Sequence, residues 1–183
     1  MAELLSPDLA NVAESEYPES SNERRDTTQA VMLWRKRVSD IGFPPPLTEF
    51  DLTRMASEWA YRFVISGGDV EHSAFLVYGA RFARLLELTE KPISFSPMID
   101  QIPERYRSLF TEGAREAISD GAPARYNGVV AHEDRFEFYR AAFMPVRMNS
   151  SLNRLIFGSF NYRVVSRWLP DKRSIAIDTH LAN

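Results

Sequence analysis

Three consecutive segments in the second half of the chain constrain its fold most strongly. They are residues 124–132, 135–147 and 154–165, and all three are rich in Val, Ile, Phe and Tyr. Turn-forming residues separate them at 133–134 and 149–151, which is the pattern of an antiparallel meander. We therefore predict three neighbouring antiparallel strands, preceded by a helix that ends at Gly121. A curved sheet of this kind can enclose a pocket or present a docking surface.

Two more strands and several helices are expected before this meander. We predict strands at residues 59–66 and 73–78, joined by the turn Gly67-Gly68-Asp69, and helices at 48–55, 79–88 and 102–120. The last helix has one apolar stripe, formed by Tyr106, Phe110, Gly113 and Ala117. This element order predicts an α+β fold, a five-stranded antiparallel sheet with helices on one face, plus an N-terminal helix.

The N-terminal helix is predicted at residues 20–41. Ser20 and Glu23 have the spacing of a capping box, and Gly42 with the following prolines ends the helix. Its apolar stripe consists of Val31, Trp34, Val38 and Ile41. The stripe would fit the protein's own domain or a partner subunit. Because the proline run at 44–46 separates the helix from the sheet-forming part, we favour burial against an identical helix in a homodimer.

The first residues of the chain are acidic and contain few large apolar side chains. Residues 1–30 hold seven acids and two bases, whereas the whole chain has a net charge of only −3. A segment of this composition cannot repay the entropy of ordering. The expected domains are a disordered acidic tail at 1–19, the helix and proline linker at 20–46, the sheet domain at 47–165 and a C-terminal extension at 166–183.

Several short motifs resemble the PAS-domain family, in particular a subfamily common in alphaproteobacterial proteins. They are Phe50-Asp51, Arg62-Phe63-Val64, Tyr78-Gly79-x-x-Phe82, Pro103-x-x-Tyr106-x-x-Leu109-Phe110, and Glu137 followed by Phe143-Met144-Pro145-Val146. The resemblance covers about residues 47–165. It implies the strand order 2-1-5-4-3 and a sensory or protein-interaction module, often dimeric through a helix that precedes the first strand.

Composition and residue placement exclude several kinds of chemistry. The chain has no cysteine, so it forms no disulfide, no thiolate metal site and no flavin–cysteine adduct. His72, His132 and His180 lie in a turn, at a strand end and near the last residues, where we do not expect an axial haem ligand. No two histidines have metal-ligand spacing, and no nucleophile lies near a base. We therefore predict no metal, no cofactor and no enzymatic activity.

Charge and hydropathy narrow the range of partners. The apolar runs are only a few residues long, far short of the roughly 20 that cross a bilayer. The first residues lack the basic and apolar regions of a signal peptide. Basic residues near Trp168 are too few for a nucleic-acid patch. We expect a soluble cytoplasmic protein that binds neither nucleic acid nor membrane.

Five residues are candidates for a ligand pocket: Phe82, Phe110, Tyr126, Arg140 and Asn161. Alternation does not determine whether Arg140 and Asn161 face the helices or the outside, because the strand register is unknown. An inward Arg140 would need Glu137, Asp100 or an anionic ligand as its partner, whereas an outward one would lie exposed over the sheet. The aromatic residues either fill the core or leave room for a small molecule. Gly158, inside a strand, indicates the close approach of a ligand or of backbone or, as we favour, a bulge or bend.

Two functions are compatible with these observations. The first is a stand-alone PAS-like sensory or regulatory module that is dimeric and acts through an unidentified signalling protein, with or without a small-molecule ligand. The second is a small-molecule binder or enzyme on another α+β fold, such as a cone-shaped isomerase-like fold, with Asp100 or His132 in a helix-lined cavity. Strand order separates them, because only the PAS-like sheet is expected to have the order 2-1-5-4-3.

Overall fold

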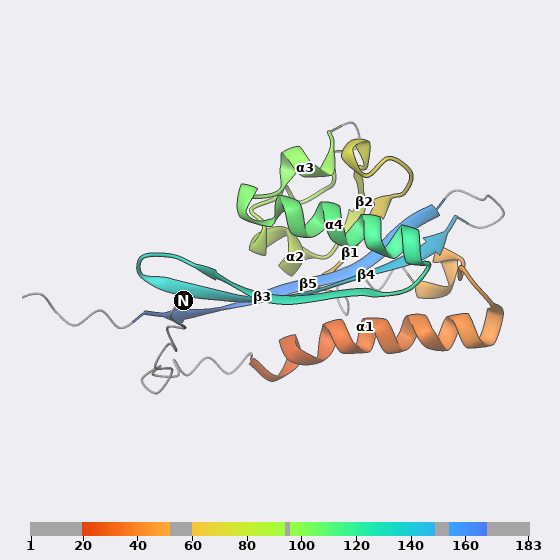
Figure 1. The fold of residues 1–183 in the computed structure, drawn as a ribbon, viewed down its shortest axis with the longest axis horizontal. Coiled ribbons are helices and arrows are strands. Elements are labelled where there is room, and N and C mark those ends of the chain that lie inside the picture. Colours follow the sequence, from red (N-terminus) through yellow and green to blue (C-terminus); the bar gives the residue numbers. More distant parts are fainter. Residues whose placement is uncertain (1–19, 52–59, 94–95, 149–153, 168–183) are drawn as a thin grey trace, which may run out of the picture.

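The computed structural model describes residues 20–51, 60–93, 96–148 and 154–167, with side chains from residue 26 onward. A sheet lies at the centre of this part of the chain and carries helices on both faces (Figure 1). The predicted tail at 1–19 and nearly all of the predicted C-terminal extension, including His180, lie outside the described residues.

The sheet has five antiparallel strands in the order β2-β1-β5-β4-β3, as predicted. They are β1 (Arg62–Ser66), β2 (Phe75–Tyr78), β3 (Ala124–Ala131), β4 (Arg135–Arg147) and β5 (Arg154–Ser166). The bounds of the three-strand meander agree with prediction to within a residue. The first hairpin is shorter than predicted, because Ala60 and Tyr61 form a turn and β1 begins only at Arg62. This order is that of a PAS-like α+β fold.

Three helices cover one face of the sheet, which we name the inner face (Figure 1). They are α2 (Ala80–Leu85), α3 (Met98–Gln101) and α4 (Glu104–Asp120), and short 3-10 turns lie at Leu47–Phe50 and Val70–His72. Helix α4 begins after Pro103 and ends at Gly121, whose φ of 63° is the left-handed conformation that glycine adopts readily. The predicted stripe of α4 is confirmed, since Tyr106, Phe110, Gly113 and Ala117 are all buried.

Aromatic rings fill the space between the inner face and these helices. Six rings are fully buried: Phe63, Phe75, Phe82, Phe110, Phe143 and Phe160. The ring of Phe63 contacts four of the others. Gly158 makes room for this packing, because a β-carbon there would lie 2.2 Å from Cζ of Phe63. The expected bulge is wrong: Gly158 pairs in regular register with Phe63 and Phe143. The group that closely approaches Gly158 is the ring of Phe63 in the same chain.

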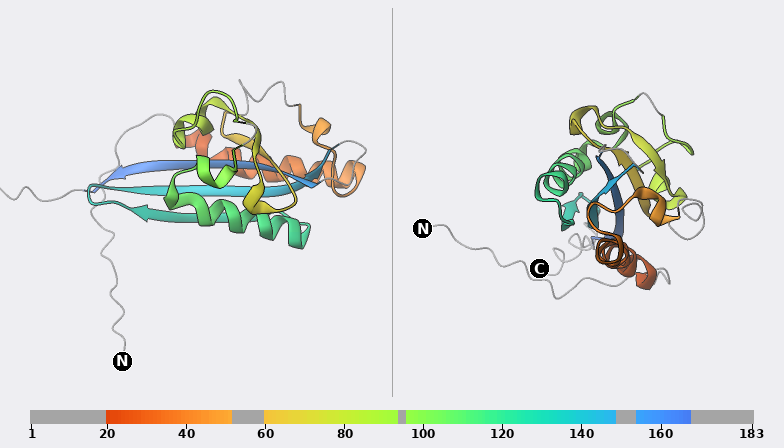
Figure 2. Two further views of the ribbon diagram at one scale, coloured as in Figure 1. Left: turned by 90° about the horizontal axis from the view of Figure 1, so that it is seen from above. Right: turned by 90° about the vertical axis from the view of Figure 1, so that its right-hand side faces the viewer.

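Helix α1 (Ser20–Ile41) lies on the opposite, outer face of the sheet (Figure 2). A second apolar cluster joins its residues Ala30, Val31 and Trp34 to Phe50, Val64, Ala142, Met144, Val146, Leu155 and Phe157. Trp34 also donates a hydrogen bond from Nε1 to the carbonyl oxygen of Pro145, at 2.8 Å. The indole thus satisfies its only polar group while it is 5% exposed.

The proline run ties α1 to the sheet instead of separating it. Arg147, at the end of β4, donates its backbone N–H to the carbonyl oxygen of Pro45 at 3.1 Å and its Nε to that of Pro44 at 3.0 Å. Val31 and Trp34 therefore face this chain's own sheet. The premise that the stripe needs a second subunit is wrong, because one chain already covers most of it.

One end of the sheet extends beyond the helices. Figures 1 and 2 show the β3–β4 hairpin and the last residues of β5 projecting past the start of α1 and past α2–α4. Strand pairing continues to the tip, where Phe136 is opposite Val165. Apolar side chains are exposed here, with Val129 at 50% and Phe138 at 36%.

Candidate functional site

The five residues predicted to line a pocket do not form one site. Phe82 and Phe110 are buried in the aromatic core of the inner face. Arg140 and Asn161 are opposite each other in the β4–β5 register, and both lie on the outer face because Ala142, two residues after Arg140, packs in the cluster with α1. Arg140 is exposed. The register between β4 and β5 determines which face Arg140 and Asn161 occupy. Alternation within one strand does not reveal that register.

The two remaining polar candidates are held by helices on opposite sides of the sheet. Asn161 is buried beneath α1, and its Nδ2 lies 3.5 Å from Oγ1 of Thr27. Tyr126 is half-buried on the inner face and donates its hydroxyl to Glu116 of α4. This hydrogen bond, with partial burial, raises the pKa of Tyr126 to about 12. Tyr126 packs against the aromatic core that contains Phe82 and Phe110, whereas Asn161 lies on the other face of the sheet.

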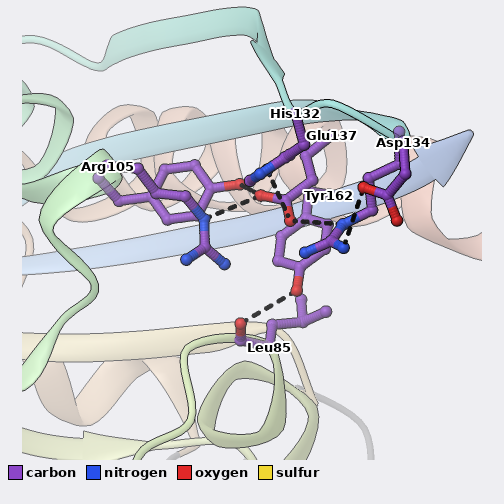
Figure 3. Close-up of polar contacts among 8 residues, drawn as sticks. Leu85, Arg105, His132, Asp134, Glu137 and Tyr162 are labelled. Atoms are coloured by element: carbon purple, nitrogen blue, oxygen red, sulfur yellow. Dashed lines mark hydrogen bonds and ion pairs between the residues drawn. The ribbon is translucent and has the colours of Figure 1, made fainter. Parts of the chain in front are cut away.

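A buried carboxylate, Glu137, is the centre of a polar cluster at the edge of the inner core (Figure 3). Its side chain is 2% exposed. One oxygen, Oε2, accepts hydrogen bonds from the Tyr106 hydroxyl at 2.8 Å and from Nε of Arg105 at 2.9 Å. The other, Oε1, lies 3.2 Å from Nε2 of His132 and 3.6 Å from Nε of Arg135. The partners come from the start of α4, the β3–β4 turn and β4 itself.

The surroundings of Glu137 keep it ionised. Burial alone would raise the pKa of its carboxyl group, but the hydrogen bond from Tyr106 and the positive charge of Arg105 outweigh burial and lower it. Burial and the neighbouring carboxylate raise the pKa of Tyr106, so its hydroxyl stays a neutral donor. Burial also raises the pKa of Tyr162, which donates to the carbonyl oxygen of Leu85 at 3.2 Å. At neutral pH the cluster holds one negative charge between arginines.

This cluster stabilises a charge and is poorly suited to proton transfer. Both oxygens of Glu137 face donors, and a carboxylate with a lowered pKa is a weak base. Arg105 and Arg135 are 28% and 42% exposed, so solvent reaches the cluster from one side. Its structural effect is to connect the start of α4 to the β3–β4 hairpin.

The burial of Glu137 has a signal in the sequence. Alternation along β4 places Glu137 on the same face as Tyr139, Ala141 and Phe143, and a carboxylate at a core-facing position needs donors. Its partners could not be identified in advance, because Tyr106 lies 31 residues away in the sequence and belongs to another element.

A second buried ion pair holds α1 against the outer face. Oδ1 of Asp26 lies 3.2 Å from both Nε and Nη2 of Arg62 in β1. Its Oδ2 accepts a hydrogen bond from Ser159 of β5 at 2.6 Å. All three residues are buried. The N-terminal half of α1 is thus joined to two strands by charged and polar groups as well as by apolar contacts.

The other residues considered for chemistry lie apart from one another. His72 and Asp69 form an exposed pair at 2.6 Å, and their hydrogen bond raises the pKa of His72 and lowers that of Asp69. Asp100 is exposed on α3. A shallow surface pocket of about 270 Å³ lies between the turn at Asp69 and the side of α4 at Arg115. Within the described ranges, no three His, Cys, Asp or Glu residues are placed to hold a metal ion.

The outer face of the projecting sheet end has a distinct composition, and we name it the arginine–phenylalanine face. It consists of Val129, Phe136, Phe138, Arg140, Arg163 and Arg167. The guanidinium carbon of Arg163 lies 5.6 Å from the ring centroid of Phe138, and that of Arg167 lies 5.7 Å from the centroid of Phe136. Guanidinium groups at these distances are attracted to the ring faces, which keeps the aromatic and cationic groups together at the surface.

No family model matches the chain, and no curated protein matches it. Among solved structures, it is similar to the PAS domain of BvgS from Bordetella pertussis, at 11% sequence identity and a TM-score of 0.47, over 70% of this chain and 90% of that chain. The fold assignment itself is based on the strand order and helix placement described above. Among the described helices, none is long and apolar enough to cross a membrane.

Proposed function

We propose that the protein is a non-enzymatic PAS-like regulatory module that acts in the cytoplasm through contacts with a signalling protein. One observation carries the proposal: aromatic rings pack the space between the described strands and helices of the inner face, whereas one end of the sheet presents an exposed arginine–phenylalanine face. The strand order supports this function over a binder or enzyme with a cone-shaped fold. Neither Asp100, which is exposed, nor His132, which lies beside Glu137, occupies the position that the second function requires.

The packing of the interior supports signalling by contact. A small molecule between the sheet and α4 would have to displace rings whose centroids are 5–6 Å apart, such as those of Phe63, Phe110 and Phe143. Gly113 faces the ring of Phe143 so closely that a β-carbon there would lie 2.3 Å from it. Opening such a core loses the dispersion contacts of several rings at once.

The composition of the arginine–phenylalanine face also supports a protein partner. Aromatic residues and arginine are enriched in protein–protein interfaces and supply most of their hot spots. A photo-crosslinking phenylalanine analogue at position 138 should therefore give one reproducible adduct in cells that express the full chain. The same analogue at Leu76, which is 44% exposed on the edge strand β2, is the matched control. Equal adducts at both positions, or none at position 138, would contradict the proposal.

A homodimer remains part of the proposal, but through the solvent side of α1. Of the four predicted dimer residues, Val31 and Trp34 are buried in the chain's own cluster, Val38 is half-buried, and Ile41 is exposed. Met32, Ile41 and Phe43 are 46–64% exposed. Native mass spectrometry should show a dimer that Ile41→Glu converts to monomer and that Ile93→Glu, an exposed control, does not. A monomeric wild type would contradict the dimer proposal. A small molecule retained by the protein would contradict the inference that aromatic rings leave no room for a ligand.

A further inference from the structure

The arginine–phenylalanine face has a strong imbalance of charge. Arg140, Arg163 and Arg167 have no carboxylate partner among the described residues. The outer-face positions of β3 and β4 near the tip hold Asn127, Val129, Ala131, Phe136 and Phe138, none of which is acidic. The arginines of the Glu137 cluster differ from these three: Arg105 and Arg135 are both paired with Glu137. A face with three cations, exposed rings and no acid is suited to an acidic segment that also carries apolar side chains.

The chain contains one segment of that chemistry, residues 1–19. It holds five acidic residues (Glu3, Asp8, Glu14, Glu16 and Glu19) and no Lys or Arg. Its apolar side chains, Leu4, Leu5, Leu9, Val12 and Tyr17, are interspersed among the acids. The sequence predicts no stable structure for this segment on its own, but such segments bind oppositely charged surfaces.

The segment joins the described structure beside the face. It ends at residue 19, where α1 begins, and Thr27 in α1 contacts Asn161, which is opposite Arg140 in the sheet. From Arg140 to Arg135, at the tip of β4, is five residues, or roughly 17 Å of strand. A 19-residue segment can span up to roughly 60 Å. Because it is tethered, its effective concentration at the face is on the order of millimolar, which makes weak charge pairing sufficient.

We propose that residues 1–19 bind the arginine–phenylalanine face of the same chain. This inference rests on the proposed function in one respect, because both use the same surface. The segment would cover that surface until a partner protein displaces it. The carboxylates pair with Arg140, Arg163 and Arg167, and the apolar side chains cover Phe138 and Val129. Binding within one chain distinguishes the proposal from contact with a second copy or with an acidic partner.

A spin label provides a direct test, because the chain has no cysteine and Ala10→Cys creates a unique attachment site. In the 183-residue chain at low salt, the label should broaden the amide signals of Val129, Phe138 and Arg163 and leave those of β2 sharp. Arg140→Gln/Arg163→Gln/Arg167→Gln should abolish the broadening. The matched control, Arg84→Gln/Lys91→Gln/Arg115→Gln, removes the same charge from exposed positions on other surfaces and should preserve it. Raising the salt from about 0.1 M to about 1 M shortens the Debye length from about 10 Å to about 3 Å and should also abolish it.

Several results would overturn the inference. Broadening that is uniform, or concentrated on other elements, would show that the segment does not bind this face. Broadening transferred from a labelled chain to an unlabelled, isotope-enriched copy would assign the contact to a second molecule. If the triple arginine variant fails to fold, Gln or Asn at the five acidic positions tests the same pairing from the other side. If the spin-label experiment shows that residues 1–19 do not bind this face, the crosslinking test at position 138 still stands. The two proposals can therefore fail separately.

Discussion

At the scale of single residues, the position of Glu137 shows how one charged side chain is accommodated in a core. The side chain is buried on a strand whose following residues on the same face, Tyr139, Ala141 and Phe143, are aromatic or small. Its stability depends on two donors from α4 and on the nearby groups of His132 and Arg135. Because Arg105 and Arg135 remain partly exposed, water can solvate them if the carboxylate is removed, which limits the cost of the change.

Glu137→Gln should lower the free energy of unfolding by about 2 kcal/mol at pH 7, the loss of hydrogen bonds to a charged group. The pKa of Glu137 is lower in the folded protein than in the unfolded chain, where it is about 4.5. Its ionised form therefore contributes fully above that unfolded value, and the contribution disappears as the pH falls through the folded-state pKa. Urea denaturation should show the difference between wild type and variant shrinking as the pH falls below the unfolded-state value. Glu104→Gln, at an exposed position of α4, should change stability little at any pH.

Gly158→Ala tests the packing between β5 and β1. The new β-carbon would lie 2.2 Å from Cζ of Phe63 and 2.8 Å from the backbone carbonyl oxygen of Ala142, so a ring or a strand must move. Overpacking of this kind costs typically about 1–3 kcal/mol. Thermal unfolding should show a lower midpoint, and Phe63→Leu in the Gly158→Ala background should recover part of the loss. An unchanged midpoint would mean that the ring of Phe63 does not occupy this space.

At the scale of elements, the sequence predicted the secondary structure of each segment better than its position in the fold. The meander, α4 and α1 follow from hydrophobic periodicity and from Gly and Pro at their ends, such as Gly121 and Gly42. The four-residue helix α3 has too short a pattern to be recognised. The location of α1 could not be predicted, because a stripe with Trp34 fits either a sheet or a second helix. The hydrogen bonds from Arg147 to Pro44 and Pro45 hold α1 against the sheet of its own chain. They join residues about 100 positions apart in the sequence.

Trp34→Ala tests whether α1 belongs to the core of its own domain. Trp34 is 5% exposed, and removing a buried Trp side chain typically costs about 3–5 kcal/mol. The loss in free energy of unfolding should be the same at low and high protein concentration, because the contact is within one chain. A contact between chains would make stability depend on concentration. Ile41→Ala, at the exposed end of the same stripe, should change monomer stability by less than about 0.5 kcal/mol.

At the scale of the whole molecule, the strand order was predictable but the functional surfaces were not. The order followed from the resemblance of short motifs and from the succession of elements. The predicted pocket failed because Arg140 and Phe82 lie on opposite faces, a fact determined by the register across β4 and β5. The arginine–phenylalanine face was missed for the same reason: Phe138 and Arg163 come together only when two strands pair. Pairings across strands depend on tertiary contacts that no single segment encodes.

Helix α1 and the sheet are expected to unfold as one cooperative unit. The buried pair of Asp26 and Arg62 and the contacts of Trp34 make α1 part of the same packed unit as the sheet. Native-state hydrogen exchange should therefore show the amides of Val31 and Trp34 opening with the same free energy and the same urea dependence as that of Phe157 in β5. Amides at the projecting tip of the β3–β4 hairpin should open at lower free energy, which provides an internal reference. If α1 instead opens separately with a small urea dependence, the domain boundary that the sequence predicts at residue 46 is real, and α1 is an appendage that can leave the sheet.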